Sequence, residues 1–366
     1  MNARHASDET HASTPTVRYA VVGAGQIART AILPAFPHAH NAELVALVSD
    51  DPAFRDDLRE RYRIEHAVDG DGYEELVSSG LVDAVYITAP THTRCELAVA
   101  AARSGVHVLC EQPMARSVAE AEQMLMAAEA NDVRLMVAHR PDFERANLEA
   151  LDELDAGVLG ELRAFEATLS EPVGPSDPRL RPIERGGGAL FELGIYCVHT
   201  AREVLHAEPI EVMAMRASSE DPRFRACDQT SAAILRFPGD RLATFTVSFG
   251  TTRLSCYRLI GTDALLEMRP AFEHGRNLAY AIVHDDGARL EKTFEQRDAV
   301  APELIHFSRC ILEGHQPHPD GAQGLADLRI CCALQQSADE GRPVSLVPGR
   351  QEAQAPAGPT PLSGLF

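Results

Sequence analysis

Three polar residues with acid–base side chains recur at helical spacing in a stretch that is otherwise apolar. Glu192, Tyr196 and His199 lie at positions i, i+4 and i+7 of FELGIYCVHTAREVL, so a helix presents all three on one face. Burying such groups without a purpose would be costly. An imidazole with an ordinary pKa of about 6.5 can relay a proton to a neighbouring phenol at neutral pH. The alternative for His199 is a core histidine with a backbone partner.

A second group of polar residues follows a buried-looking run in CEQPMA, residues 110–115. Glu111, Gln112 and the rigid Pro113 come directly after GVHVLC, so we expect them to be presented at the end of a strand. The amide of Gln112 can orient a substrate by donating a hydrogen bond, but it supplies no charge to a developing anion. Any mechanism that needs a lysine is restricted to Lys292, because the chain contains no other.

The elements that must position these residues begin at residue 17. Up to residue 140, short apolar runs such as VRYAVV and DAVYIT alternate with amphipathic stretches such as PAFRDDLRERY. Strands separated by helices of this length need right-handed crossovers, which predict a parallel sheet covered on both faces. The first part of the chain is therefore predicted to form a doubly wound α/β domain.

The sequence GAGQIA, residues 23–28, follows the first predicted strand and opens the first helix. Gly23 permits a tight turn, Gly25 lets the backbone approach a pyrophosphate, and Ala28 still allows close helix packing. The N-terminus of the helix then faces the anion. This context predicts a Rossmann dinucleotide-binding domain over residues 17–140. The residues expected to bind the cofactor's phosphates are Gly23, Ala24, Gly25, Gln26 and Ile27.

An acidic residue closes the second predicted strand at about the offset expected of a ribose ligand. A carboxylate at Asp50 would bind a ribose 2′-hydroxyl and repel a 2′-phosphate, which favours NAD over NADP. Arg55, one turn later, could compensate for that repulsion, so NAD is favoured only slightly. The alternative for Asp50 is a helix N-cap before Pro52.

Beyond residue 140 the pattern changes to longer alternating runs such as TSAAILRF and LATFTVSF. Such runs favour an antiparallel sheet with one buried face, and the closing ELIHFSRCILEG and GLADLRICCALQQSADEG predict helices packed on it. Residues 141–348 are thus expected to form an α+β substrate domain with a large, mainly antiparallel open sheet. An open sheet face often pairs with a second subunit, so we expect a homodimer or homotetramer. The tails, residues 1–16 and 349–366, are expected to be flexible.

Charge and composition exclude several classes of function. The formal net charge of −20 disfavours binding to nucleic acid and to anionic membrane surfaces. No run approaches the roughly 20 apolar residues of a membrane span, and eight cysteines without a CxxC pair indicate buried thiols in a reducing cytosol. The histidines of PHAH and HQPHPD lack the partners of a zinc site, so no metal is expected. The sequence therefore predicts a cytoplasmic protein whose ligands are small molecules.

Three motifs in order, GAGQIA, CEQPMA and GGGALFELGIYCVHTAREVL, resemble the glucose-fructose oxidoreductase/inositol dehydrogenase (GFO/IDH/MocA) family. The resemblance covers about residues 17–348. AHRPDFERAN and GIYCVHTAR look most like the branch that holds glucose-fructose oxidoreductase, xylose dehydrogenase and dihydrodiol dehydrogenase. The resemblance implies a nicotinamide cofactor, NAD or NADP, bound between two domains, and a carbohydrate-like substrate.

The resemblance also implies roles for single residues. Glu111 would help to hold the cofactor, and Glu192 replaces the family's usual aspartate. The family's lysine near the substrate hydroxyl is replaced here by Gln112. Because a lysine lowers the pKa of a neighbouring tyrosine, its loss could slow the reaction by about 10² to 10³ fold. The residues implied to lie beside the nicotinamide are Ala89, Pro90, Thr91 and His92.

On the helix, Tyr196 matches the tyrosine that exchanges a proton with the sugar oxygen during hydride transfer. His199 stands where relatives often have asparagine. His139 and Arg140 lie where the family places residues near the nicotinamide or the substrate. Arg140 could restore positive charge to the pocket, and its alternative is a surface ion pair with Glu144.

The leading hypothesis is an NAD(P)-dependent oxidoreductase that moves a hydride between nicotinamide and a carbinol or carbonyl carbon of a sugar-like or cyclic polyol substrate. Tyr196 would donate or accept the proton, supported by Gln112, Glu192 and His199. An alternative is a nicotinamide-binding sensor or assembly protein that has lost catalysis, in keeping with the missing lysine. A third hypothesis keeps a tightly held cofactor that is recycled between two substrates.

Overall fold

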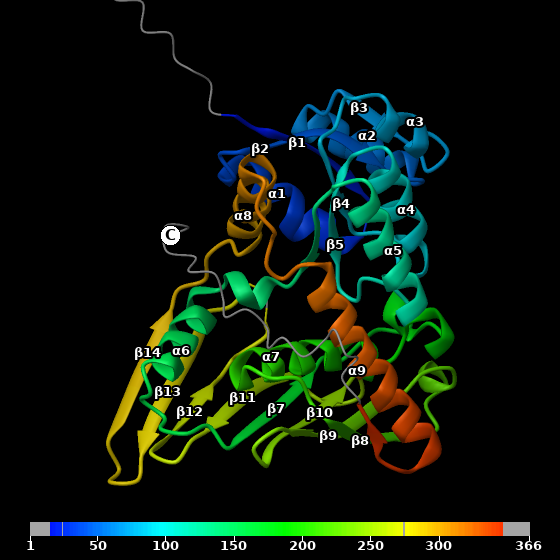
Figure 1. The fold of residues 1–366 in the computed structure, drawn as a ribbon. Coiled ribbons are helices and arrows are strands. Elements are labelled where there is room, and N and C mark those ends of the chain that lie inside the picture. The colour runs from blue at the N-terminus through cyan, green and yellow to red at the C-terminus, as the bar shows by residue number, and fades with distance from the viewer. Residues whose placement is uncertain (1–14, 24, 274, 347–366) are drawn as a thin grey trace, which may run out of the picture.

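The computed structural model describes residues 15–23, 25–273 and 275–346 of the 366-residue chain. The expected tails lie outside this part apart from residues 15 and 16, and so does Ala24 of the phosphate loop. The described residues form two sheets, one above the other in Figure 1, with helices between and around them.

Six parallel strands form the first sheet, in the order β3-β2-β1-β4-β5-β6, which confirms the predicted doubly wound sheet. The order reverses between β1 and β4, so the carboxyl ends of these strands flank the crevice in which such folds bind ligands. Its strands are β1 (Val17–Val22), β2 (Ala42–Val48), β3 (His66–Val68), β4 (Ala84–Ile87), β5 (His107–Glu111) and β6 (Leu135–Ala138). Its helical elements are η1 (Ala28–Ile32), α1 (Leu33–Ala35), η2 (Phe36–His38), α2 (Pro52–Tyr62), α3 (Tyr73–Ser78), α4 (Thr91–Arg103) and α5 (Val118–Ala130).

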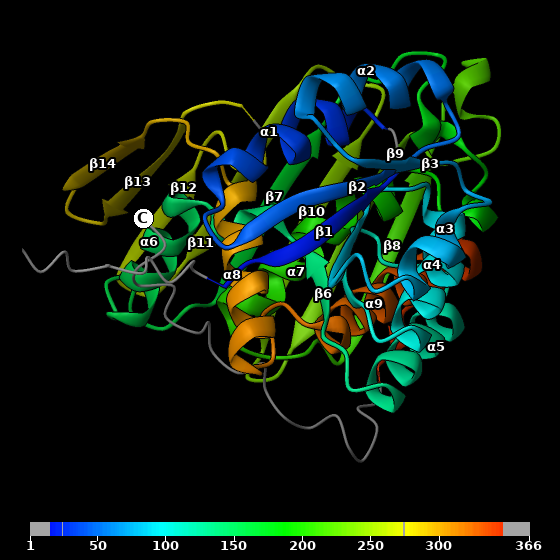
Figure 2. The same cartoon turned by 90° about the horizontal axis from the view of Figure 1, so that it is seen from above.

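A helix from the far end of the chain completes the core of the first sheet. α8 (Val300–Glu313) contacts β1 and β2, as Figure 2 shows from above. Leu304 and Phe307 are buried in the same apolar cluster as Tyr19, and Ser308 Oγ lies 2.8 Å from Tyr19 Oη. The prediction that this segment packs on the second sheet is therefore wrong. The amphipathic pattern identifies a helix, but it does not identify the sheet that its apolar stripe meets.

Nine strands form the second sheet, in the order β14-β13-β12-β11-β7-β10-β9-β8-β15. β7 and β10 are parallel, and the other neighbours are antiparallel. The predicted mainly antiparallel open sheet is thus confirmed. Its strands are β7 (Ala164–Ser170), β8 (Glu211–Ala217), β9 (Thr230–Phe237), β10 (Arg241–Ser248), β11 (Leu254–Ile260), β12 (Ala264–Met268), β13 (Leu278–His284), β14 (Arg289–Phe294) and β15 (Val344–Ser345).

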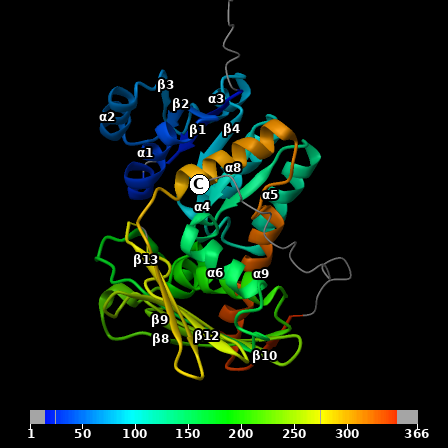
Figure 3. The same cartoon turned by 90° about the vertical axis from the view of Figure 1, so that its left-hand side faces the viewer.

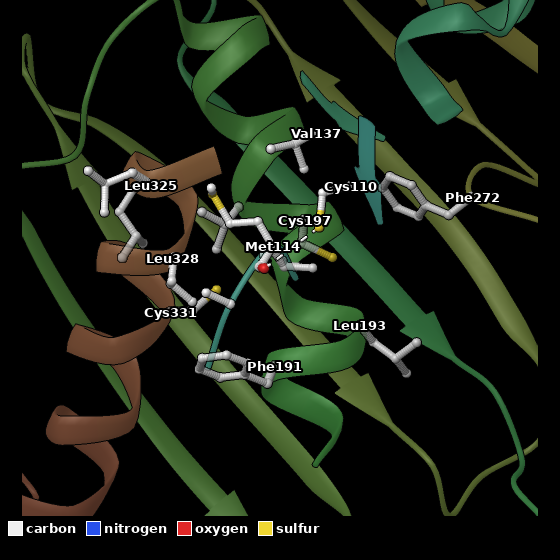
Figure 4. Packing of buried hydrophobic residues seen from close by; sticks show 14 of the residues in the cluster. Cys110, Met114, Val137, Phe191, Leu193, Cys197, Phe272, Leu325, Leu328 and Cys331 are labelled. Atoms are coloured by element: carbon white, nitrogen blue, oxygen red, sulfur yellow. Dashed lines mark hydrogen bonds between the residues drawn. The ribbon is translucent and has the colours of Figure 1, made fainter. Parts of the chain in front are cut away.

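Three helices cover one face of the second sheet, and one of them also reaches the first sheet (Figure 3). These helices are α6 (Arg145–Asp155), α7 (Ile195–Leu205) and α9 (Gly321–Glu340). α9 contacts both α5 and β6, and Figure 4 shows Met114, from the loop after β5, between α7 and α9. Gly324 permits this approach, because a Cβ there would lie 2.5 Å from Val137 Cγ2 and 2.8 Å from the Met114 sulfur. The loop after β5 is thereby held against α7 and α9. The short turns are η3 (Arg140–Phe143), η4 (Pro178–Leu180), η5 (Ile183–Arg185), η6 (Leu190–Gly194) and η7 (Pro222–Phe224).

The opposite face of the second sheet carries exposed apolar side chains. Met215 on β8 is 71% exposed and Ile234 on the neighbouring β9 is 49% exposed. β9 alternates buried and exposed residues along most of its length, as expected of a strand with only one face against a core. In Figure 3 the three covering helices lie on the other side of the sheet.

Two expectations about the whole chain concern membranes and cysteines. Among the described residues, no helix combines the length and the apolarity that crossing a bilayer requires. All eight cysteines are free, six of them buried and two partly buried, in line with the thiols predicted from the absence of a CxxC pair.

Candidate active site

Tyr196 lies on a helix whose start is held by a glycine-rich loop. Gly188 has φ +102°, and a Cβ there would lie 2.0 Å from Asp228 Oδ1. Without that Cβ, Asp228 Oδ2 accepts a hydrogen bond of 2.8 Å from the Leu190 amide, one of the amides that a helix start leaves unpaired. η6 and α7 then continue as one helical segment. The glycine therefore fixes the approach of the Tyr196 helix to the neighbouring loop.

The three polar residues of this segment lie in two kinds of helical turn. Glu192 belongs to the π-helical turn η6, whereas Tyr196 and His199 belong to α7. Glu192 Oε1 lies 3.5 Å from Arg181 Nη2. Burial raises the pKa of Glu192, and the charge of Arg181 partly opposes that shift. No hydrogen bond joins any two of the three residues in the part of the chain that the structure describes, so the expected single polar face is not one hydrogen-bonded unit.

Tyr196 is partly buried between aromatic rings. Its ring centroid lies 5.5 Å from that of His139 and 6.4 Å from that of Phe272. Burial raises the pKa of the phenol to about 12, the charge of Glu111 adds to the rise, and Arg140 opposes it. Tyr196 is thus a neutral phenol at neutral pH, able to donate a proton.

Both ring nitrogens of His199 face carboxylates. Nδ1 lies 2.6 Å from Asp327 Oδ2, and Nε2 lies 3.1 Å from Asp142 Oδ2. Arg202 also donates to Asp327, at 2.5 Å. Burial disfavours the imidazolium, but the two carboxylates outweigh it and hold the pKa of His199 well above its ordinary value. His199 therefore has no free nitrogen for a direct relay to Tyr196, and its partners are carboxylates instead of the backbone group of the alternative interpretation.

His139 stacks on His199 and shares its carboxylate. The two ring centroids are 3.8 Å apart, and His139 Nδ1 lies 2.7 Å from Asp142 Oδ1. Ligand atoms of these three residues lie within 4.8 Å of one another, a spacing that a metal ion could use. Hydrogen bonds between the same atoms account for this spacing without an ion.

Gln112 is buried at the end of β5 with its amide unpaired. Among the described residues, neither its Oε1 nor its Nε2 has a hydrogen-bond partner, which is unusual for a buried amide. The loop is held instead by Arg94, whose guanidinium donates to the carbonyls of Ala89 at 2.7 Å and of Glu111 and Pro113 at 2.6 Å each. Arg94 thereby ties the ends of β4 and β5 together and leaves the Gln112 amide free for a ligand.

The chain's lysine does not stand in for the one that Gln112 replaces. Lys292 lies on β14, at the edge of the second sheet. Its Nζ lies 2.8 Å from Glu153 Oε1 and 3.4 Å from Glu149 Oε2. This lysine is therefore committed to an ion-pair cluster with α6.

Glu111 belongs to a buried acidic group that includes a residue of α8. Tyr86 Oη lies 3.1 Å from Glu111 Oε1 and 3.0 Å from Glu303 Oε2. Burial raises the pKa of Glu303 well above its ordinary value, and the charge of Glu111 adds to the rise. Because one hydroxyl proton cannot serve two carboxylates, we assign Glu303 as the protonated member of the group.

Arg140 pairs with Glu144, the partner considered for it. Its guanidinium forms an ion pair with Glu144, and Nη2 donates to the Phe272 carbonyl at 2.7 Å. The side chain is only 17% exposed, so the pair is mostly buried. Its charge also lowers the pKa of Tyr196, so positive charge reaches the site.

The phosphate loop fits a dinucleotide. Gly23 has φ +113°, and a Cβ there would lie 2.6 Å from Ala89 N and 2.8 Å from Thr88 Oγ1. A Cβ at Gly25 would meet no atom of the described residues within 4 Å. The turn thus has no room for a side chain at Gly23 and is open at Gly25. This arrangement suits a pyrophosphate bound at the helix start. The residues exposed at that start are Gln26 and Ile27.

Asp50 is exposed at the end of β2. Its Oδ1 accepts a hydrogen bond of 2.7 Å from the Gly70 amide. The N-cap of α2 is Asp51, so the N-cap alternative for Asp50 is wrong. Arg55 Nη1 donates to the Ser49 carbonyl at 2.8 Å, which places a guanidinium beside the same strand end.

The residues after β4 meet the glycine-rich loop of the other sheet. Ala89 and Thr91 are buried, whereas Pro90 and His92 are exposed. A Cβ on Gly186 would lie 3.4 Å from Thr91 Cγ2. The start of α4 thus lies close to the loop that leads to the Tyr196 helix.

Two family descriptions match the chain. The first, "Oxidoreductase family, NAD-binding Rossmann fold", matches residues 17–139, and the second, "GFO/IDH/MocA C-terminal domain", matches residues 148–267. The chain belongs to the GFO/IDH/MocA family. The resemblance read from the three motifs is confirmed, and the protein is an NAD(P)-dependent oxidoreductase.

This GFO/IDH/MocA protein matches its relatives over nearly all of their length. It is 30% identical over 352 residues to a D-xylose 1-dehydrogenase [NADP(+)] of Haloarcula marismortui, covering 94% of this chain and 97% of the relative. The trans-1,2-dihydrobenzene-1,2-diol dehydrogenase of Danio rerio is 28% identical, covering 85% and 94%. Among solved structures, an aldose-aldose oxidoreductase from Caulobacter crescentus has a TM-score of 0.86 at 31% identity, covering 90% and 100%. A 3-ketoreductase from Actinomadura kijaniata in complex with NADP and TDP-benzene has a TM-score of 0.80 at 26% identity, covering 88% and 98%.

Several residues of the candidate site were not assigned from the sequence. Asp142 lies three residues after His139, a helical spacing that could have indicated it. Glu303 and Asp327 come from helices late in the chain and give no local signal, since their partners are remote in sequence. The unassigned residues are Arg94, Asp142, Glu303 and Asp327.

Proposed function

We propose that this protein transfers a hydride between nicotinamide and a carbinol or carbonyl carbon of a sugar-like or cyclic polyol substrate. The observation that carries the proposal is the neutral phenol of Tyr196 beside the strand end where Gln112 has an unpaired amide. A substrate oxygen between them would meet a proton donor and a hydrogen-bond donor. The relatives named for xylose and for a dihydrodiol favour this substrate class.

The proposed roles follow from charge and burial. The nicotinamide, when bound, supplies or accepts the hydride. Tyr196 gives its proton to the carbonyl oxygen in the direction of reduction, because its raised pKa keeps the phenol protonated. Gln112 orients that oxygen, and Glu192 lines the site as an ion pair with Arg181. His199 acts as a positioning residue through its ring contact with His139.

Residues 17–140 are the proposed cofactor domain and residues 141–348 the proposed substrate domain. The helix α8 of the second range packs on the sheet of the first.

NAD is slightly favoured, because the exposed carboxylate of Asp50 would repel a 2′-phosphate. Arg55 at the same strand end and relatives named with NADP argue for the other cofactor. Titration of the protein with NADH and with NADPH, followed by nicotinamide fluorescence, measures the preference.

The decay of reduced-nicotinamide absorbance tests the proposal. Purified protein holding NADH, or NADPH in parallel, is mixed with a panel of keto-sugars, lactones and diketones. We expect decay with the wild type and none with Tyr196→Phe, which keeps the ring and loses the proton. Decay at the wild-type rate in Tyr196→Phe would refute the role of this tyrosine.

A second candidate function is a nicotinamide-binding sensor or assembly protein without catalysis. The uncharged Gln112 and the remote Lys292 favour it. Cofactor binding without turnover across the whole panel would support this candidate over the enzyme. Cofactor that stays bound through purification would instead favour an enzyme that recycles it between two substrates.

The open face of the second sheet is the proposed contact with a second copy of this chain. Exposed Met215 and Ile234 lie on neighbouring strands there, and apolar residues on an uncovered sheet face suit a symmetric pairing. We expect a dimer or tetramer by light scattering and a monomer for the double variant Met215→Glu/Ile234→Glu. An unchanged mass in that variant would contradict the assignment of this face.

A further inference from the structure

The hydrogen bonds around His199 determine where the protons of the buried cluster lie. An ionised carboxylate accepts hydrogen bonds and donates none. Each nitrogen of His199 faces such a group, Asp327 on one side and Asp142 on the other, so both nitrogens carry a proton. His199 is therefore an imidazolium between two carboxylates.

The same reasoning fixes the tautomer of His139. The second oxygen of Asp142 faces His139 Nδ1 at 2.7 Å, so Nδ1 carries the proton. Burial lowers the pKa of His139, the carboxylate of Asp142 partly offsets this, and the neighbouring His199 cation lowers the pKa further. His139 is thus neutral, and its Nε2 is a bare acceptor.

That acceptor is buried and has no partner within the described part of the chain. Leaving a buried polar atom unpaired is costly, so such atoms need an explanation. His139 follows Ala138, which pairs with Glu111 in the parallel register, so His139 and Gln112 stand at neighbouring strand ends. Its ring also lies 5.5 Å from that of Tyr196. The unpaired atom therefore belongs to the same crevice as the phenol.

We propose that His139, oriented by Asp142, is the proton-relay partner of Tyr196 in a site where the uncharged Gln112 stands in place of a lysine. The inference rests on the proposed function and adds to it the group that exchanges a proton with the tyrosine. A neutral phenol cannot hold a second proton, so it needs such an acceptor whenever a substrate hydroxyl is oxidised.

The proton and electron balance closes with these groups and the cofactor. In oxidation, the C–H bond of the carbinol breaks and its electron pair leaves with the hydrogen as hydride to nicotinamide. The hydroxyl proton passes to Tyr196 while the proton of the phenol passes to His139 Nε2 through a bridging water, because the two groups are not hydrogen-bonded to each other in the described structure. In reduction, the hydride forms the C–H bond and Tyr196 protonates the oxygen. His139 Nε2 then takes a proton from solvent and passes it to the Tyr196 phenolate, which leaves both groups neutral again.

The charges around His139 allow this transient gain of a proton. The charges of Asp142 and Asp327 favour the protonated form of His139, and the His199 imidazolium opposes it. His139 has an unprotonated Nε2 at neutral pH because its pKa is lowered before the reaction begins. The titratable and charged groups around the cluster are Asp142 on η3, Tyr196, His199 and Arg202 on α7, Asp327 on α9, His318, and Glu303 on α8. The charge of Asp142 raises the pKa of Glu303.

The variant His139→Asn separates the relay from a structural role. Asparagine can still donate to Asp142 in place of Nδ1–H, but it has no basic nitrogen. In single turnovers of a carbinol with bound oxidised cofactor, the wild-type rate should fall as the pH drops through the pKa of His139. We expect the variant to be slower by about 10² to 10³ fold and to lack that pH dependence, with unchanged cofactor affinity. The control His107→Asn, at the start of β5, should keep the wild-type profile.

If the rate of His139→Asn were lower by the same factor at every pH and still fell at acidic pH, the relay would be overturned and only a structural role would remain. A second measurement does not need turnover. Nitrogen-15 spectra of histidine-labelled protein, assigned by comparison with His139→Asn, should show His139 with a bare Nε2 and His199 doubly protonated at neutral pH. A protonated His139 Nε2 would overturn the relay. If the wild type turns over no substrate, the proposed function fails, while these spectra still decide the protonation on which the relay depends.

Discussion

Replacing the buried cation of α7 by a neutral side chain tests the charge assignment directly. In His199→Gln, Asp142 and Asp327 lose an imidazolium that lies 3.1 and 2.6 Å from their oxygens. Removing one partner of a buried ion pair costs about 3–5 kcal/mol. Asp142 keeps the donor of His139, and Asp327 keeps that of Arg202. We therefore expect the free energy of unfolding to fall by about 3 kcal/mol, at the lower end of that range.

The pH dependence of this loss gives the sharper test. The folded pKa of His199 is raised above its unfolded value of about 6.5. Its stabilisation is then complete below that value and is lost as the pH rises through the folded pKa. The folded pKa of Asp327 is lowered by His199 and Arg202 in spite of burial, so its contribution is complete above about pH 4 and is lost as the pH falls through the folded pKa. The difference between wild type and variant should be greatest at about pH 5 to 6 and should shrink in alkaline buffer.

Urea unfolding followed by circular dichroism at a series of pH values measures this difference. The matched control is Arg258→Gln, which removes an ion pair with Glu267 whose side chains are 50% and 26% exposed. Such a pair contributes at most about 1 kcal/mol. A loss in His199→Gln no larger than that of the control, or one that grows as the pH rises, would refute the assignment of a buried cation.

The remaining predictions concern the cofactor, the phenol and the helix start. Gln112→Lys should lower the pKa of Tyr196 from about 12 and raise the rate of carbonyl reduction by up to about 10² fold, measured as NADH decay; an unchanged rate would count against the importance of the missing charge. Asp50→Asn should raise the affinity for NADPH relative to NADH by roughly tenfold, or about 1.4 kcal/mol, in fluorescence titrations, and no change would remove Asp50 from the ribose site. Gly188→Ala should destabilise the protein by about 2 kcal/mol or more, because its Cβ would meet Asp228 Oδ1 at 2.0 Å; a melting temperature equal to that of the wild type would contradict this.

The first sheet and the phosphate loop could be predicted because their signals are local. Strand and helix periods alternate within residues 17–140, and Gly23 is required by contacts to Thr88 and Ala89 that follow from the β1-to-β4 crossing. The end of β5 could also be predicted from the sequence, since Glu111 and Gln112 come directly after an apolar run. Such features depend on neighbours in the chain and on the rules of parallel sheets.

The charged cluster could not be predicted because its members meet only in the folded chain. His199 and Asp327 are 128 residues apart, and neither carries a local sign of the other. The π-helical turn at Glu192 changes the helical spacing that the expected single face assumed. Arg94 illustrates a further limit, because its three carbonyl partners depend on how two loops come together.

The return of α8 to the first sheet has a consequence for the order in which the chain can fold during synthesis. Leu304 and Phe307 cover part of one face of a sheet whose strands end at residue 138. At roughly 5–20 residues per second of translation, roughly 10 to 35 seconds pass between the synthesis of the last strand of this sheet and that of α8. Throughout the synthesis of the second sheet, the nascent Rossmann segment therefore exposes the apolar surface that α8 later covers, which is the kind of surface that favours aggregation in incompletely folded chains.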